Sequence, residues 1–218
     1  MKKEVWDHLM FLLAEWAKKF DPPAVTKEAQ QSKDPFRVLI ATVLSARTKD
    51  EVTYEAAKRL FNLASTPKAI ANLSEEKIAK AIKPVNFYIT KAKRIKQIAK
   101  ILVENHNGKV PKDLETLLTL PGVGRKTANL VLTEGYGLYG VCVDTHVHRI
   151  LNRLGLAKTK KPVETEFFLR KVLPKEHWIR INTYLVSFGQ KVCTPISPFC
   201  SKCVISTICK KVGVKRQR

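Results

Sequence analysis

The chain has 218 residues, of which 44% are hydrophobic, enough to build the core of one domain or of two closely packed ones. Its 40 Lys and Arg residues outnumber 19 Asp and Glu residues, which gives a formal net charge of +21. The charge predicts a surface that attracts polyanions, and the apolar content excludes a disordered polycation. The longest apolar run near the start, residues 9–13, is too short for a membrane span or a signal peptide. We therefore expect a cytoplasmic, nucleoid-associated protein whose five cysteines form no disulfide framework.

Apolar residues that recur at three- and four-residue steps predict a mostly helical chain. No segment shows the alternation of a strand bounded by turn pairs, and no repeat or low-complexity linker is present. The expected helices, in chain order, span residues 4–19, 36–44, 50–60, 74–82, 89–105, 113–118, 126–133, 145–154, 162–172 and 178–191.

Basic residues gather on one face of the expected helix 89–105. Its apolar stripe leaves Lys93, Arg94, Lys96 and Lys100 on the opposite side. Such a face is either solvated or follows a phosphate backbone, and the charge of the whole chain favours the second interpretation.

Four cysteines near the C-terminal end follow the spacing C-x6-C-x2-C-x5-C: Cys193, Cys200, Cys203 and Cys209. Four thiolates within one loop can hold a tetrahedral zinc ion or an iron–sulfur cluster. Zinc sites usually use two C-x2-C pairs, whereas this loop has one pair flanked by single cysteines, which favours the larger cluster. Cys142 stands apart and is expected to be a small core residue.

The segment L-P-G-V-G-R-K-T-A, residues 120–128, places a glycine hairpin between two expected helices. The amides of Gly122, Val123 and Gly124, together with the N-terminus of the following helix, can cradle a phosphate oxygen. The spacing fits neither a P-loop nor a dinucleotide fingerprint. An ordinary glycine turn between packed helices remains the alternative.

Lys126 follows the hairpin at the start of a helix, where the helix dipole and the adjacent Arg125 disfavour a charged ammonium. A lysine in that position can act as a free-amine nucleophile. Eighteen residues later, V-D-T-H-V places Asp144 where another helix begins. Asp144 can be a plain N-cap, a catalytic carboxylate, or both.

Together, the hairpin, the spacing from Lys126 to Asp144 and the cysteine pattern resemble endonuclease III, the iron–sulfur branch of the helix-hairpin-helix DNA glycosylases. The resemblance runs from about residue 25 to residue 209. It implies an all-α protein of two domains with duplex DNA between them, one 4Fe–4S cluster on the four cysteines, and a monomeric chain. The hairpin domain would span residues 23–134, and the cluster domain would combine residues 1–22 with 135–218.

The resemblance also implies DNA contacts outside the hairpin. L-S-A-R-T-K-D, residues 44–50, is similar to a family segment whose Gln enters the DNA, and here Arg47 stands at that position. Phe87 would be the wedge that fills the gap left by a flipped nucleotide, unless it is a core aromatic. The cysteine loop lacks a basic residue between positions 194 and 199, and Lys191 and Lys202 could substitute for it.

The implied activity is that of a bifunctional DNA glycosylase and abasic-site lyase, with Lys126 as nucleophile and Asp144 as its electrostatic partner. Oxidised pyrimidines are the expected substrates. An adenine-specific mismatch enzyme of the same branch lacks the lysine, whereas a thymine or uracil mismatch glycosylase stays open because of Arg47. A non-enzymatic, zinc-dependent DNA-binding protein is the alternative from a different class.

Overall fold

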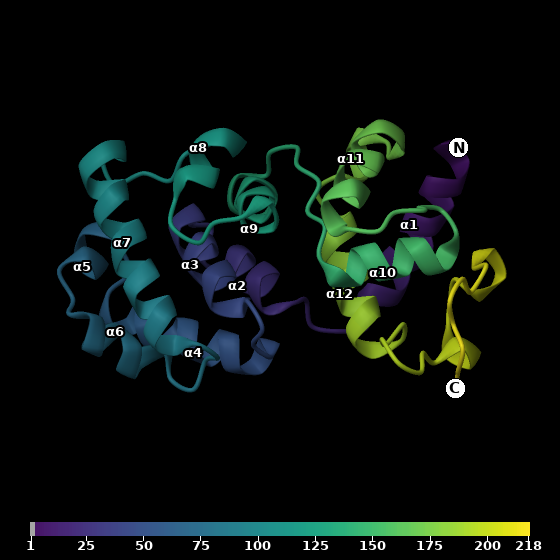
Figure 1. Ribbon diagram of the computed structural model, residues 1–218, viewed down its shortest axis with the longest axis horizontal. Helices are drawn as coiled ribbons and strands as arrows, with labels where there is room; N and C mark the ends of the chain where they lie inside the picture. The colour runs from purple at the N-terminus through teal and green to yellow at the C-terminus, as the bar shows by residue number, and fades with distance from the viewer. Residues whose placement is uncertain (1–2) are drawn as a thin grey trace. The chain divides into compact units, whose positions relative to one another are not determined.

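The computed structural model describes residues 3–218, and every regular element in that range is helical (Figure 1). The expected all-α class is therefore confirmed. The α-helices are α1 (Lys3–Ala17), α2 (Ala24–Ser32), α3 (Pro35–Ser45), α4 (Asp50–Leu63), α5 (Pro67–Ala71), α6 (Glu75–Ile82), α7 (Tyr88–His106), α8 (Leu114–Thr119), α9 (Arg125–Leu130), α10 (Thr145–Leu154), α11 (Pro162–Val172) and α12 (Ile181–Lys191). A π-helical turn, η1 (Val131–Gly135), continues α9, and three 3₁₀ turns are η2 (Lys175–His177), η3 (Cys200–Lys202) and η4 (Ser206–Ile208).

The chain divides into two compact units. One is Ala24–Leu138, and the other combines Met1–Pro23 with Tyr139–Arg218. The domain boundaries expected from the resemblance stay a prediction. Within residues 3–218, no helix has both the length and the apolar character needed to cross a membrane.

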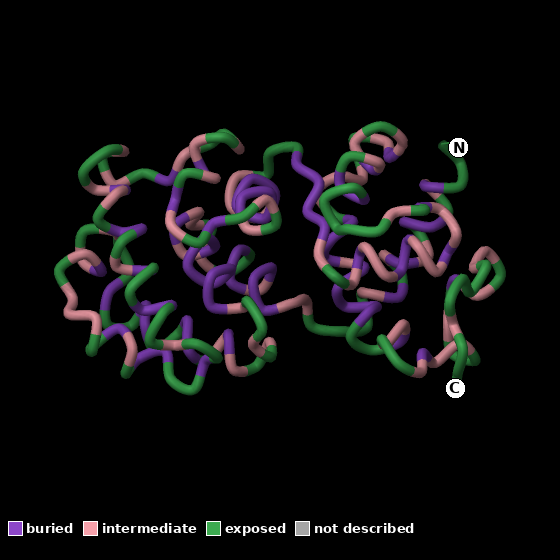
Figure 2. Tube along the Cα trace, viewed as in Figure 1, coloured by how far each residue is buried: buried purple, intermediate pink, exposed green. Residues whose placement is uncertain are grey.

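Helix α3 forms the centre of the unit 24–138 and packs against α2, α4, α7 and α9. Its start is set by Asp34, whose side chain accepts a hydrogen bond from the Phe36 N–H at 2.9 Å, and by Pro35 in the first turn. Residues 38–44 are all buried, as Figure 2 shows for the core of this unit. The end of α3 is therefore a firmly held point from which the next loop projects.

The core of the second unit joins α1 to the C-terminal helices α10, α11 and α12. Trp6, Leu9 and Leu13 of α1 are fully buried, and the Trp16 ring meets the Phe188 ring edge-on at 5.0 Å between centroids. This packing explains how the first helix of the chain belongs with the part that carries the cysteines.

All ten expected helices are confirmed, with shifts at their ends. Two helices were missed, α2 and α5. The helix expected from residue 178 begins only at Ile181, because the preceding residues form a 3₁₀ turn and a hydrogen-bonded turn instead.

Candidate active site and cysteine loop

The hairpin between α8 and α9 needs its first glycine. Gly122 has a φ of 74°, and a Cβ added there would lie 2.8 Å from Cδ of Arg94. The Val123 side chain is buried, and its N–H donates to the Leu120 carbonyl at 3.1 Å. That amide is therefore used inside the turn. The expected phosphate cradle stays a prediction and would rest on the backbone around Gly124 and on the first turn of α9.

Lys126 is the second residue of α9 and is exposed. The other side of the helix is packed into the core, where Ala128, Asn129 and Leu130 are buried. Within the helix, the Asn129 side chain donates to the Arg125 carbonyl at 3.0 Å. Lys126 therefore stands on the outward face of a fixed helix, directly after the hairpin.

Asp144 is the N-cap of α10, as one of the two interpretations of its position predicts. Its Oδ1 accepts hydrogen bonds from the amides of His146 at 2.8 Å and Val147 at 3.0 Å. These bonds fix the carboxylate at the start of the helix. Asp144 belongs to the unit with the cysteines and Lys126 to the other unit. A catalytic role for Asp144 stays a prediction.

Arg47 and Phe87, the two residues expected to enter DNA, are both exposed. Phe87 is 62% exposed, so the alternative of a core aromatic is wrong. Both residues have a left-handed backbone, with φ of 55° and 58° respectively. That conformation is uncommon for residues other than glycine.

Lys91, which the sequence analysis missed, is a buried lysine of α7 with only 4% of its surface exposed. Its Nζ donates to the carbonyls of Leu44 at 2.8 Å and Ala46 at 2.7 Å, and to Oγ1 of Thr48 at 3.2 Å. Burial lowers the pKa of Lys91 to about 8, and the charge of Arg94 acts in the same direction. Lys91 lies four, seven and eleven residues before the buried Ile95, Ile98 and Leu102, a helical stripe that could have revealed its burial.

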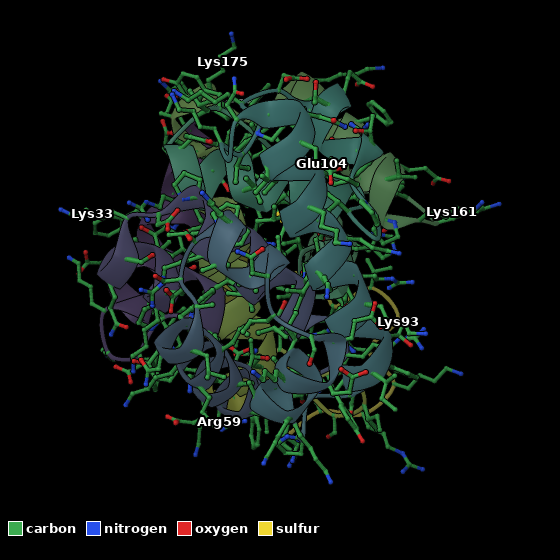
Figure 3. All side chains as sticks on the ribbon, turned by 90° about the vertical axis from the view of Figure 1, so that its left-hand side faces the viewer. Lys33, Arg59, Lys93, Glu104, Lys161 and Lys175 are labelled. Atoms are coloured by element: carbon green, nitrogen blue, oxygen red, sulfur yellow. The ribbon has the colours of Figure 1, made fainter. Side chains whose placement is uncertain are left out.

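The outer face of α7 carries the expected cations. Lys93 and Lys100 are exposed and Lys96 is half-buried, and Figure 3 shows Lys93 projecting away from the ribbon. Arg94 joins this face to the hairpin, because its side chain packs beside Gly122. A phosphate backbone that reaches the hairpin would therefore meet these cations within the same unit.

The four expected ligands, Cys193, Cys200, Cys203 and Cys209, line a single cavity of about 350 Å³, a volume that includes its opening to solvent. Apolar side chains from α10 and α12 form its inner wall, among them Ile150, Leu154 and Phe188. Cys142 lies outside this loop and is fully buried, as expected.

The chemistry of the cavity fits a cationic group that binds thiolates. Burial raises the pKa of Cys203 to about 11 and also raises the pKa of Cys209, so bare thiolates of these two cysteines are unfavourable there. Hydrogen-bond donors lie beside the sulfur atoms: Arg153 Nη1 lies 3.3 Å from Cys193 Sγ, and the Lys211 amide lies 3.4 Å from Cys209 Sγ. Donors of this kind tune thiolate-ligated metal centres.

Within residues 3–218, no three His, Cys, Asp or Glu side chains gather closely enough to hold a metal ion. The identity of the group that the four cysteines would hold stays a prediction.

Lys191 and Lys202, the lysines expected to replace the missing basic residue of the cysteine loop, have different surroundings. Lys191 is exposed and its Nζ lies 4.9 Å above the Phe20 ring, while Lys202 is an exposed residue of η3.

A carbonyl of the cysteine loop is held by a side chain of α10, because Arg153 donates to the Thr194 carbonyl at 2.7 Å. This arginine was missed by the sequence analysis, because nothing in the spacing connects it with residues forty positions away.

Residues 40–175 match the model of the HhH-GPD superfamily base excision DNA repair proteins. The chain is 51% identical over 177 residues to "Endonuclease III" of Thermotoga maritima, a match that covers 81% of this chain and 83% of that protein. The chain belongs to the endonuclease III family. The match with "Endonuclease III homolog 2, chloroplastic" of Arabidopsis thaliana, at 48% identity, covers 80% of this chain and 47% of that longer protein.

Solved structures of the endonuclease III family have the same fold as this chain. A structure described as a trapped endonuclease III–DNA covalent intermediate superposes with a TM-score of 0.80 at 34% identity, over 94% of this chain and 96% of that one. A thermostable thymine-DNA glycosylase also has a TM-score of 0.80, over 92% of both chains, but at 24% identity this likeness concerns the fold alone. The endonuclease III family generally carries a 4Fe–4S cluster.

Proposed function

We propose that this chain removes damaged bases from duplex DNA and then cleaves the resulting abasic site. Membership of the endonuclease III family makes it a base excision repair DNA glycosylase and lyase. The observation that carries the residue assignment is Lys126, exposed on the first turn of α9 directly after the glycine hairpin. The trapped covalent intermediate of the structural relative supports an enzyme nucleophile.

In the proposed reaction the target nucleotide first leaves the base stack, at a cost of a few kcal/mol that is smallest for a weakened or mispaired base. The Nζ of Lys126 then attacks C1′ of the sugar, and the bond from C1′ to the base breaks. Opening of the sugar ring gives a Schiff base between Lys126 and C1′. The carboxylate of Asp144 stabilises the positive charge that develops on the sugar and helps to transfer protons.

Strand cleavage follows from the same intermediate. Loss of a proton from C2′ allows the 3′ phosphate to leave by β-elimination, and hydrolysis of the imine returns Lys126 to the free amine. No electron transfer is required in any of these steps. Cys193, Cys200, Cys203 and Cys209 would hold an iron–sulfur cluster, whose binding would fold the loop and position DNA.

Damaged duplex DNA is the proposed partner, with binding centred on the hairpin and on the outer face of α7. The hairpin of Gly122, Val123, Gly124 and Arg125 would hold one phosphate through its backbone around Gly124 and Arg125, while Lys93 and Lys96 neutralise others. Phe87 would fill the gap left by the flipped nucleotide, and Arg47 would contact the orphaned base. Lys191 and Lys202 would add contacts from the cysteine loop.

Oxidised pyrimidines are the proposed substrates. The presence of Arg47, where the family has a Gln, favours a second candidate substrate. An exposed arginine in place of an amide changes the hydrogen-bond donors offered to the orphaned base. A mismatched thymine or uracil therefore remains a candidate substrate.

A cleavage panel tests the proposal. Duplexes that contain thymine glycol, dihydrouracil, uracil, mismatched thymine or an abasic site are each incubated with the protein, with and without borohydride. We expect a trapped adduct on the abasic duplex and on the duplexes with oxidised pyrimidines. An adduct confined to mismatched thymine and uracil supports the second candidate, and binding without any cleavage or adduct contradicts both.

A further inference from the structure

Arg47 and Phe87 are two of the exposed residues of the unit 24–138 that have a left-handed backbone conformation, which Lys33 and Asn107 share. Arg47 follows the end of α3, and Phe87 directly precedes α7. Residues other than glycine keep this conformation only where their surroundings hold it. The contacts around each loop therefore decide whether these two side chains are presented in a fixed direction.

The Arg47 loop is held from α7 by Lys91. Its buried ammonium donates to the carbonyls of Leu44 and Ala46 and to Oγ1 of Thr48, at 2.7 to 3.2 Å. The last carbonyls of a helix lack partners within that helix and carry partial negative charge, so a cation is favourable at this place. Lys91 thus caps the C-terminal end of α3 and forms hydrogen bonds with residues on both sides of Arg47.

The Phe87 loop has a separate brace. Arg59 of α4 donates from Nε to the Ala81 carbonyl at 2.9 Å and from Nη2 to the Lys83 carbonyl at 2.5 Å. The two loops are also joined directly, because the Asn86 side-chain amide donates to the Arg47 carbonyl. Lys91 and Asn86 are therefore the links between the loops, whereas Arg59 holds only one of them.

We propose that Lys91 is a positioning residue that ties the Arg47 loop to the Phe87 loop, so that both side chains enter the duplex as one unit. The inference rests on the proposed function of this chain as a DNA glycosylase. Lys91 touches no substrate in this role. It acts by ordering the Arg47 loop before binding, which removes an entropy cost from the step in which the base leaves the stack.

A mutant cycle tests the coupling. Single-turnover release of the base is measured for Arg47→Ala, Phe87→Ala and the double variant, each with Lys91 and with Lys91→Met. With Lys91 present, we expect the double variant to differ from the product of the single effects by about tenfold, as coupled residues do. With Met at position 91 the effects should multiply to within about twofold. Lys80→Met, an exposed lysine of α6, is the matched control and should keep the coupling.

Asn86→Ala provides a second route, because Asn86 is exposed and its removal leaves the core intact. It should weaken the same coupling even if Lys91→Met fails to fold. Coupling that is absent from the parent protein, or unchanged in the variants that fold, overturns the inference. Borohydride trapping on abasic DNA separates the two proposals, since that substrate has no base to release. Normal trapping with unchanged coupling refutes only the role of Lys91, whereas no trapping by the parent protein refutes the proposed function.

Discussion

Arg149 donates from Nη2 to the carbonyl oxygen of Cys193 at 2.7 Å. The same nitrogen lies 3.1 Å from the Gly189 carbonyl, at the end of α12. Helix α10 carries Arg149 and begins immediately after Asp144. The helix that Asp144 caps is therefore bonded to the first residue of the cysteine loop, and order in the loop is linked to order in that helix.

Loss of one cysteine ligand should disturb DNA binding rather than the nucleophile. Cys200→Ser or Cys203→Ser should yield protein that is poorly soluble or binds DNA weakly, because cluster binding supplies local folding free energy. Visible absorption reports the cluster, and a binding titration reports the affinity. Cys142→Ala is the matched control, a buried cysteine outside the loop, and should keep the absorption. A cluster-free preparation that cleaves DNA with the parent affinity would contradict both proposed roles of the cluster.

Lys126→Gln should bind abasic DNA yet lose strand cleavage and the borohydride-trapped adduct, because an amide cannot form the imine. Gel separation of the trapped complex measures the adduct. Lys80→Gln, which changes an exposed lysine of α6 in the same unit, should trap at the parent rate. Trapping that persists in Lys126→Gln would place the nucleophile elsewhere.

Asp144→Asn should slow base release by roughly 10²-fold, the scale of losing one preorganised charge at a transition state, with little loss of DNA affinity. Asn also caps helices well, so the fold should be kept. Asp113→Asn is the matched control, since Asp113 caps α8 by accepting from the Thr116 amide at 2.8 Å. If Asp144 only caps α10, both variants will turn over normally, and Asp144→Ala will lose only about 1 kcal/mol of stability.

Apolar periodicity predicted the helices that bury an apolar stripe and failed where the buried face is polar. Helix α2 buries Thr26 and Glu28 together with small residues, and Glu28 is paired with Arg37 at 2.6 Å. A partner nine residues away cannot be read from periodicity. Helix α5 has only five residues, too few for a pattern, although Thr66 caps it through the Ala69 amide.

The motifs of the site could be predicted from local spacing, whereas the supports of those motifs could not. Lys126, Asp144 and the cysteines stand in patterns that a sequence displays directly. Lys91 acts on carbonyls 45 and 47 residues earlier in the chain, so its role depends on the packing of α7 against α3. Phe87 is exposed and has a left-handed backbone, neither of which the sequence of that loop specifies.

DNA affinity should fall steeply with salt, and the outer face of α7 should account for part of that dependence. Each neutralised phosphate contributes about −0.9 to the slope of log K against log salt, so Ala at positions 93, 96 and 100 should flatten the slope by up to roughly 2.7. The matched control replaces Lys158, Lys160 and Lys161, three exposed lysines before α11, and removes the same charge. Fluorescence anisotropy at several salt concentrations measures both slopes. Equal changes in the two triple variants would show a general effect of net charge, and an unchanged slope in the α7 variant would return this face to a solvated surface.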